Sequence, residues 1–133
     1  MKKFLLLLIF IPLIGLGQIE AITEYSITTI SNGKSVNERD NNFYAIKIVW
    51  QDSRKSGWVS MSKNSTDAYK GHTKWSFDVY ARQLNNDGNL EYWCNEGGQY
   101  YSFTIDNNSS KQKIIERKIV NKRIVKQTTH YIR

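Results

Sequence analysis

Apolar and polar side chains alternate with a period of two over long stretches of this chain. The alternation is strict in Trp75–Arg82 and recurs in Tyr44–Trp50 and in Tyr101–Ile105. Successive side chains of a β-strand point to opposite faces, so this pattern is typical of strands with one buried face. Aromatic and β-branched residues are plentiful in the same segments, which also favours strands. The pattern predicts an all-β protein.

Glycines and other turn residues divide these segments into short strands. We expect about seven or eight strands, near 22–30, 43–51, 57–62, 74–83, 89–95, 99–106, 113–120 and 123–131. Short strands with hairpin turns and no convincing interior helix predict a small antiparallel barrel or a two-layer sandwich. Within 74–106 the tight turns predict a meander.

Two glycine turns define the register of that meander. Asp87-Gly88 and Gly97-Gly98 are each typical of a two-residue hairpin loop. These loops place the lone cysteine, Cys94, opposite Ala81 on one side and Tyr101 on the other, on the apolar face. A buried thiol packs as a small hydrophobe and is a poor nucleophile, so we expect a structural role. One cysteine also excludes a disulfide within the chain.

The other face of the meander carries a candidate binding surface. The same register places Arg82 opposite Trp93, with Tyr80 and Tyr100 nearby. Either a second sheet, a loop or the N-terminal strand covers this face, or the cluster is an exposed platform for a sugar ring, a nucleobase or a protein partner.

The first 17 residues match a secretory signal peptide. Lys2 and Lys3 precede the 13-residue apolar run 4–16, and Gly15 and Gly17 supply small residues two apart. The run is too short for a spanning helix, which needs ~20 residues, and we expect no transmembrane segment after cleavage. We therefore expect residues 18–133 to form a single exported β-domain, which is secreted, or periplasmic if the source is Gram-negative.

Within residues 18–133, the excess of positive over negative charge lies in the C-terminal segment. Residues 18–110 hold nine Lys/Arg and eleven Asp/Glu, whereas residues 111–133 hold eight Lys/Arg and only Glu116. This segment favours a hairpin turning at Asn121-Lys122, with a helix as the alternative. We expect its basic side chains on the solvated side, as gatekeepers of a sheet edge or as contacts for a polyanion. The candidate contacts are Lys118, Lys122, Arg123 and Lys126.

The chain lacks the common catalytic and metal-binding motifs. Neither a Gly-x-Ser-x-Gly elbow nor a His-Glu-x-x-His motif occurs, and one cysteine with two distant histidines does not supply a zinc site. We identify no catalytic residue, metal site or cofactor. The leading hypothesis is a non-enzymatic binding protein for a carbohydrate, a protein or a polyanion.

Two other functions stay open. One is a small barrel with an internal apolar ligand cavity, lined by Trp50, Trp75, Phe77, Tyr92 and Phe103, although such residues more often fill a core. The other is a small secreted hydrolase, for which Asp78, Glu91 and Glu96 are the available carboxylates, although alternation places them at the surface.

Overall fold

The computed structural model describes residues 18–31, 35–63, 73–107 and 111–133, so the predicted signal peptide lies outside the described residues. Within these ranges the protein is all-β and contains no helix. The strands are β1 (Ile19–Ser31), β2 (Ser35–Asp40), β3 (Tyr44–Gln51), β4 (Ser56–Lys63), β5 (Thr73–Leu84), β6 (Leu90–Glu96), β7 (Gln99–Asp106), β8 (Lys113–Val120) and β9 (Arg123–Ile132).

Eight of the strands close into an antiparallel barrel. Strands β3 to β9 follow one another as a meander, and β1 pairs with β3 through Ile19–Ile22 and with β9 through Thr23–Ile30. Both barrel and meander agree with the sequence prediction. The ninth strand, β2, lies outside the barrel on the free edge of β1. It was not predicted, because the sequence SVNERD shows no apolar alternation.

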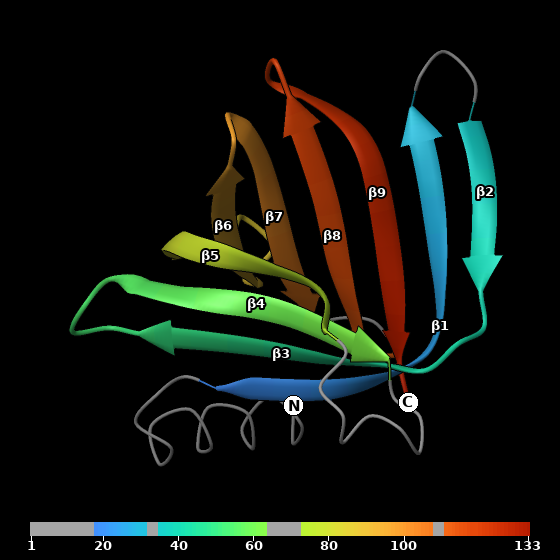
Figure 1. The fold of residues 1–133 in the computed structure, drawn as a ribbon, viewed down its shortest axis with the longest axis horizontal. Helices are drawn as coiled ribbons and strands as arrows, with labels where there is room; N and C mark the ends of the chain where they lie inside the picture. Colours follow the sequence, from blue (N-terminus) through green and yellow to red (C-terminus); the bar gives the residue numbers. More distant parts are fainter. Residues whose placement is uncertain (1–17, 32–34, 64–72, 108–110) are drawn as a thin grey trace.

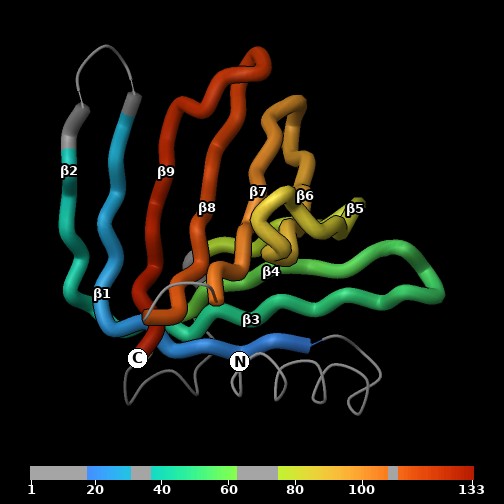
Figure 2. The backbone as a smooth tube through the Cα atoms, turned by 180° about the vertical axis from the view of Figure 1, so that it is seen from behind, coloured from blue at the N-terminus to red at the C-terminus, as the bar shows by residue number. Residues whose placement is uncertain are grey.

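Strand β1 changes direction at a β-bulge, and this bend shapes the barrel. The register shifts by one residue between Thr23 and Tyr25. The first half of β1 therefore runs along β3 and the second half along β9, as Figure 1 shows from the front and Figure 2 from behind. The hydroxyl of Thr23 accepts a hydrogen bond from the backbone amide of Tyr44 (2.9 Å). This bond provides the Tyr44 amide with an acceptor at the first residue of β3.

Two hairpin turns follow the sequence prediction. Gly97 and Gly98 have φ values of 59° and 82°, and Asn121 and Lys122 have 52° and 63°. Positive φ at both central residues is the geometry of the two-residue hairpin whose twist matches the flanking strands. The C-terminal segment is therefore a hairpin, with Val120 opposite Arg123, and the helical alternative is wrong.

The predicted register between β5 and β6 is wrong. The loop spans Asn85–Asn89 rather than two residues, because the Asn85 side chain accepts hydrogen bonds from the amides of Asp87 (2.9 Å) and Asn89 (3.0 Å). A bulge at Tyr80 shifts the pairing again. Cys94 is consequently opposite Val79 instead of Ala81.

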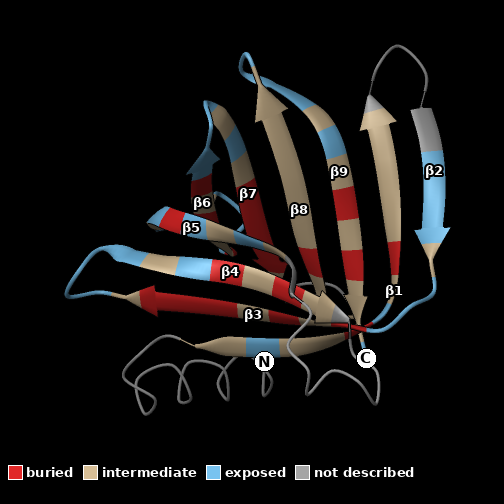
Figure 3. Ribbon diagram, viewed as in Figure 1, coloured by how far each residue is buried: buried red, intermediate tan, exposed pale blue. Residues whose placement is uncertain are grey.

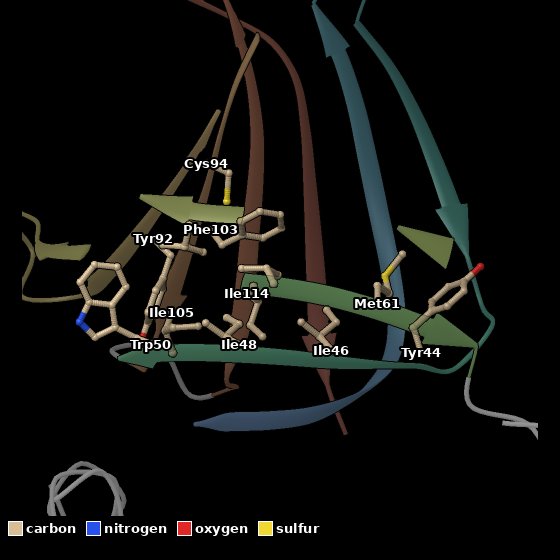
Figure 4. Packing of buried hydrophobic residues seen from close by; sticks show 12 residues of the cluster. Tyr44, Ile46, Ile48, Trp50, Met61, Tyr92, Cys94, Phe103, Ile105 and Ile114 are labelled. Carbon is tan, nitrogen blue, oxygen red and sulfur yellow. The ribbon is translucent and has the colours of Figure 1, made fainter. Parts of the chain in front are cut away.

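The apolar core lies where β3 and β4 cross β6 and β7. Figure 3 shows the buried residues gathered on these strands and on the bases of β8 and β9. In Figure 4, Ile46 and Ile48 on β3 and Phe103 on β7 lie in this layer, together with Cys94 on β6. The fully buried Cys94 confirms the predicted structural position. Burial, followed by the negative charges of Asp78 and Glu116, raises the pKa of its thiol to about 12.

Candidate ligand-binding cavity

The interior of the barrel is polar on one side and apolar on the other. One rung of paired residues crosses the inner face from β1 to β6, and its members are Thr28, Thr128, Glu116, Phe103 and Tyr92 in that order. The three polar members lie on β1, β9 and β8. The two aromatic members lie on β7 and β6 and belong to the apolar core. Because buried polar groups require partners or water, the polar half of the rung marks a part of the interior that is not simply packed.

A bulge at Val125 places the polar side chains of β9 inside the barrel. Ile119 pairs with Ile124, but Lys118 pairs with Lys126, so Val125 has no partner in the ladder. A one-residue shift moves every following side chain to the other face. Lys126, Thr128 and His130 therefore point inward.

These side chains line a cavity of about 260 Å³, and of the three Lys126 is exposed. Its walls come from β1 to β5 and β7 to β9. The lining is formed by Ser26, Thr28, Asp40, Tyr44, Met61, Trp75, Phe77, Tyr101, Glu116, Lys118, Lys126, Thr128 and His130.

One wall of the cavity is aromatic. Phe77 stacks on Tyr101 with ring centroids 4.4 Å apart, and Trp75 lies 5.1 Å from Phe77. Met61 pairs with Trp75 across β4 and β5, and Figure 4 shows Met61 at the end of the core that lies towards β1. Aromatic faces and a flexible thioether accommodate flat or irregular apolar groups.

A chain of hydrogen bonds forms the opposite wall. The Ser26 hydroxyl lies 2.8 Å from Nδ1 of His130, and Nε2 of His130 lies 2.9 Å from a carboxylate oxygen of Glu116. At the next inward-facing positions of β1 and β9, the hydroxyls of Thr28 and Thr128 are 2.9 Å apart. Ser26 and His130 are only 3% and 2% exposed, so each has its partner inside the protein. The chain fixes these side chains before any ligand binds.

Serine, histidine and glutamate are also the residues of a hydrolase triad. At Ser26, β1 is paired with β2 on one edge and with β9 on the other. The backbone amide of Ser26 is therefore engaged in the sheet and is not itself available as an oxyanion-hole donor. We assign the chain of bonds to positioning the cavity wall.

Four charged residues lie at the cavity besides His130. Lys118 and Lys126 face each other across β8 and β9, and among the residues that the structure describes neither forms an ion pair. The two carboxylates are engaged: Glu116 with His130, and Asp40 with the Tyr44 hydroxyl at 2.5 Å.

The predicted outer surface is brought together only in part. Tyr80 and Tyr100 are 50% and 42% exposed, and their rings meet edge to face at 6.4 Å. Trp93 and Tyr100 line a shallow groove at the tips of two hairpins, together with Gly98, Ile119, Asn121, Lys122 and Ile124. The indole N–H of Trp93 is buried and has no hydrogen-bond partner in the described part of the chain. No second sheet covers this face among the described strands.

Arg82 is not part of that surface. The changed register places it opposite Tyr92, and its side chain is 19% exposed. Its guanidinium lies 3.3 Å from Asp52 and 5.6 Å from the centre of the Trp50 ring. The Trp50 indole donates to Asp52 (2.8 Å), and this hydrogen bond together with the Arg82 charge lowers the pKa of that carboxyl. Arg82 therefore stabilises one end of the barrel.

The basic C-terminal segment does not form one continuous surface. Lys118 and Lys126 line the cavity; Lys126 is exposed, as expected for the basic side chains of this segment, whereas Lys118 is half-buried. Lys111 pairs with Glu24, and Lys113 lies 3.8 Å from Asp106. The remaining exposed charges at the hairpin tip belong to Lys122 and Arg123. This division weakens the polyanion hypothesis.

The predicted internal cavity differs from the observed one. Trp75 and Phe77 line the cavity, but Trp50, Tyr92 and Phe103 are buried in the core. The polar lining residues were missed, because inward polar side chains give the same alternation as outward ones. The only sequence signal is the polar alternation of Ser26 with Thr28 and of Thr128 with His130.

Comparison of the chain with protein-family models, with curated proteins and with solved structures finds no match. No helix in the described part of the chain is long and apolar enough to span a membrane. Within the same residues, no group of three or more histidine, cysteine, aspartate or glutamate side chains is placed to hold a metal ion.

Proposed function

We propose that this protein is an exported binding protein that holds a small amphipathic molecule in the barrel cavity. The observation that carries the proposal is the cavity itself, which has an aromatic wall facing a hydrogen-bonding wall. Ligand pockets are typically concave and mostly apolar, with a few placed polar groups that fix orientation. A barrel of eight strands is just wide enough to hold one small ligand.

The two walls define complementary parts of the ligand. A flat apolar group would lie against Trp75, Phe77 and Tyr101, where burial of apolar area contributes ~25 cal/mol per Å². Hydrogen-bonding groups of the ligand would face Thr28 and Thr128. Because His130 and Glu116 hold the polar wall in place, little conformational entropy is lost when the ligand binds.

The uncharged fluorescent probe N-phenyl-1-naphthylamine tests this proposal. We expect saturable binding that is lost in Thr28→Phe, which fills the cavity. Thr129→Phe is the matched control, since Thr129 is the neighbour of Thr128 on β9 but points to the outside. Equal binding by both variants would contradict a site in the cavity.

A second candidate function concerns the outer groove. Exposed Tyr80 and Tyr100, whose rings meet edge to face, favour a sugar ring, which stacks on aromatic faces. Saturation-transfer NMR with mono- and disaccharides tests this function. We expect a signal in the wild type that Tyr100→Ala removes and Thr28→Phe preserves, and no signal in the wild type would contradict it.

A further inference from the structure

We infer that the ligand of the cavity is an organic anion, whose carboxylate, sulfonate or phosphate group lies between Lys118 and Lys126 while its apolar body lies against the aromatic wall. The inference rests on the proposed function and deepens it by naming the class of ligand. Three observations on the described residues lead to it.

First, the two lysines form a like-charge pair on the cavity face. They are directly opposite each other on β8 and β9, and both line the cavity. Like charges at directly opposite positions destabilise a sheet. An anion between them would replace this repulsion by two attractions. The pair is thus unfavourable in the empty barrel and favourable in the occupied one.

Second, the backbone is arranged to bring Lys126 to this position. Without the bulge at Val125, the regular ladder from Val120 and Arg123 would place Val125 opposite Lys118. The valine would extend the apolar wall, and Lys126 would point outward to solvent. The bulge instead places a second positive charge on the cavity face.

Third, the negative groups of the cavity are already engaged. Glu116 is held by His130 at 2.9 Å, and Asp40 accepts a hydrogen bond from the Tyr44 hydroxyl. Among the described residues, neither Lys118 nor Lys126 forms an ion pair. The lysine ammonium groups are therefore the donors that stay available to a ligand.

The apolar wall adjoins the lysines. Tyr101 is the partner of Lys118 on β7 and stacks on Phe77, so the positive charges and the aromatic rings are next to each other. A bound molecule can contact both at once only if it combines an anionic group with an apolar body. A simple inorganic anion would leave the aromatic wall unused.

Two probes that share one framework test the inference. N-phenyl-1-naphthylamine is uncharged, and 8-anilinonaphthalene-1-sulfonate adds one sulfonate to the same rings. In the wild type we expect the sulfonate to bind about tenfold more tightly, which corresponds to about 1.4 kcal/mol. Lys118→Met/Lys126→Met should remove this preference, so that the two probes bind this variant with similar affinities. The preference should also decrease with added salt.

The control variant is Lys122→Met/Arg123→Met, which removes the same charge from the tip of the same hairpin, outside the cavity. It should keep the preference for the sulfonate. An equal loss of preference in both double variants, or no preference in the wild type, would overturn the inference. Failure of the proposed function gives a different result, because binding of both probes would then be insensitive to Thr28→Phe. Circular dichroism of both double variants confirms that the barrel is intact.

Discussion

Ser26 on β1 and His130 on β9 are directly opposite each other and share a hydrogen bond of 2.8 Å inside the barrel. The contact lies at the seam where the first and last strands of the barrel meet. The hydrogen bond therefore links the first and last strands of the barrel, and it also fixes the polar wall of the cavity.

Removal of the Ser26 hydroxyl should destabilise the barrel. Ser26→Ala leaves a buried ring nitrogen of His130 without its partner, which costs about 1–3 kcal/mol. Urea unfolding of the variant measures this loss. A double-mutant cycle with His130→Phe should give a coupling of similar size, and a coupling near zero would contradict the role of this bond at the seam.

The lysine pair makes an independent prediction about stability. Lys118→Met/Lys126→Met relieves the repulsion across β8 and β9, so the empty protein should gain ~0.2–1 kcal/mol in its free energy of unfolding. Thermal unfolding at low ionic strength measures the gain. Added salt should reduce the difference from the wild type, because it screens the repulsion. A less stable double variant would contradict the argument from like charges.

Cys94 should give the protein a specific pH dependence. Burial raises the pKa of its thiol from 9.0 to about 12 in the folded protein. Between these values the unfolded chain releases the thiol proton and the folded protein keeps it, so stability decreases as pH rises. The effect disappears well below pH 9, where the thiol keeps its proton in both states. The wild type should lose about 1 kcal/mol more than Cys94→Ala per pH unit in this window.

Urea unfolding at pH 8 and pH 10.5 tests this, because the tyrosines and lysines titrate alike in both proteins. An equal loss of stability in the wild type and in Cys94→Ala would contradict it. A thiol reagent should also leave the native protein unmodified at pH 8 and react after unfolding.

The turn at Asn121-Lys122 offers a stabilising substitution. Lys122 has a φ of 63°. This left-handed conformation lowers the stability by roughly 1 kcal/mol for a residue with a side chain, whereas glycine adopts it at little cost. Lys122→Gly should raise the free energy of unfolding by up to ~1 kcal/mol, since asparagine-glycine suits this turn. Arg123→Gly is the control in the adjacent strand and should lower it. Destabilisation by both would contradict the turn geometry.

Short-range patterns in the sequence predicted much of the fold. The alternation of Trp75 to Arg82 and the two-residue turns at Gly97-Gly98 and Asn121-Lys122 depend on local sterics, so they could be read directly. The inward position of Cys94 was also correct. A barrel closed by β1 and β9 was one of two architectures that these patterns allowed.

The cavity could not be predicted, because it depends on single extra residues. The bulges at Glu24, Tyr80 and Val125 each shift one ladder by one residue, and no residue type marks them in the sequence. The bulge at Val125 decides that Lys126 and His130 point inward. Alternation alone does not distinguish a polar residue that faces solvent from one that faces a cavity. Strand β2 was missed for a related reason, since its sequence shows no apolar alternation and its residues 37–39 are exposed.

Met61 provides the most direct measurement of the central claim. The chain contains only two methionines, Met1 and Met61, and Met61 lies in the cavity wall. Labelling with ¹³C-methyl methionine therefore gives one reporter in the cavity, which Met61→Leu assigns. We expect its signal to shift saturably with 8-anilinonaphthalene-1-sulfonate, at the concentration where the probe fluoresces. A bound, fluorescent probe that leaves the Met61 methyl signal unchanged would contradict a ligand site in this barrel.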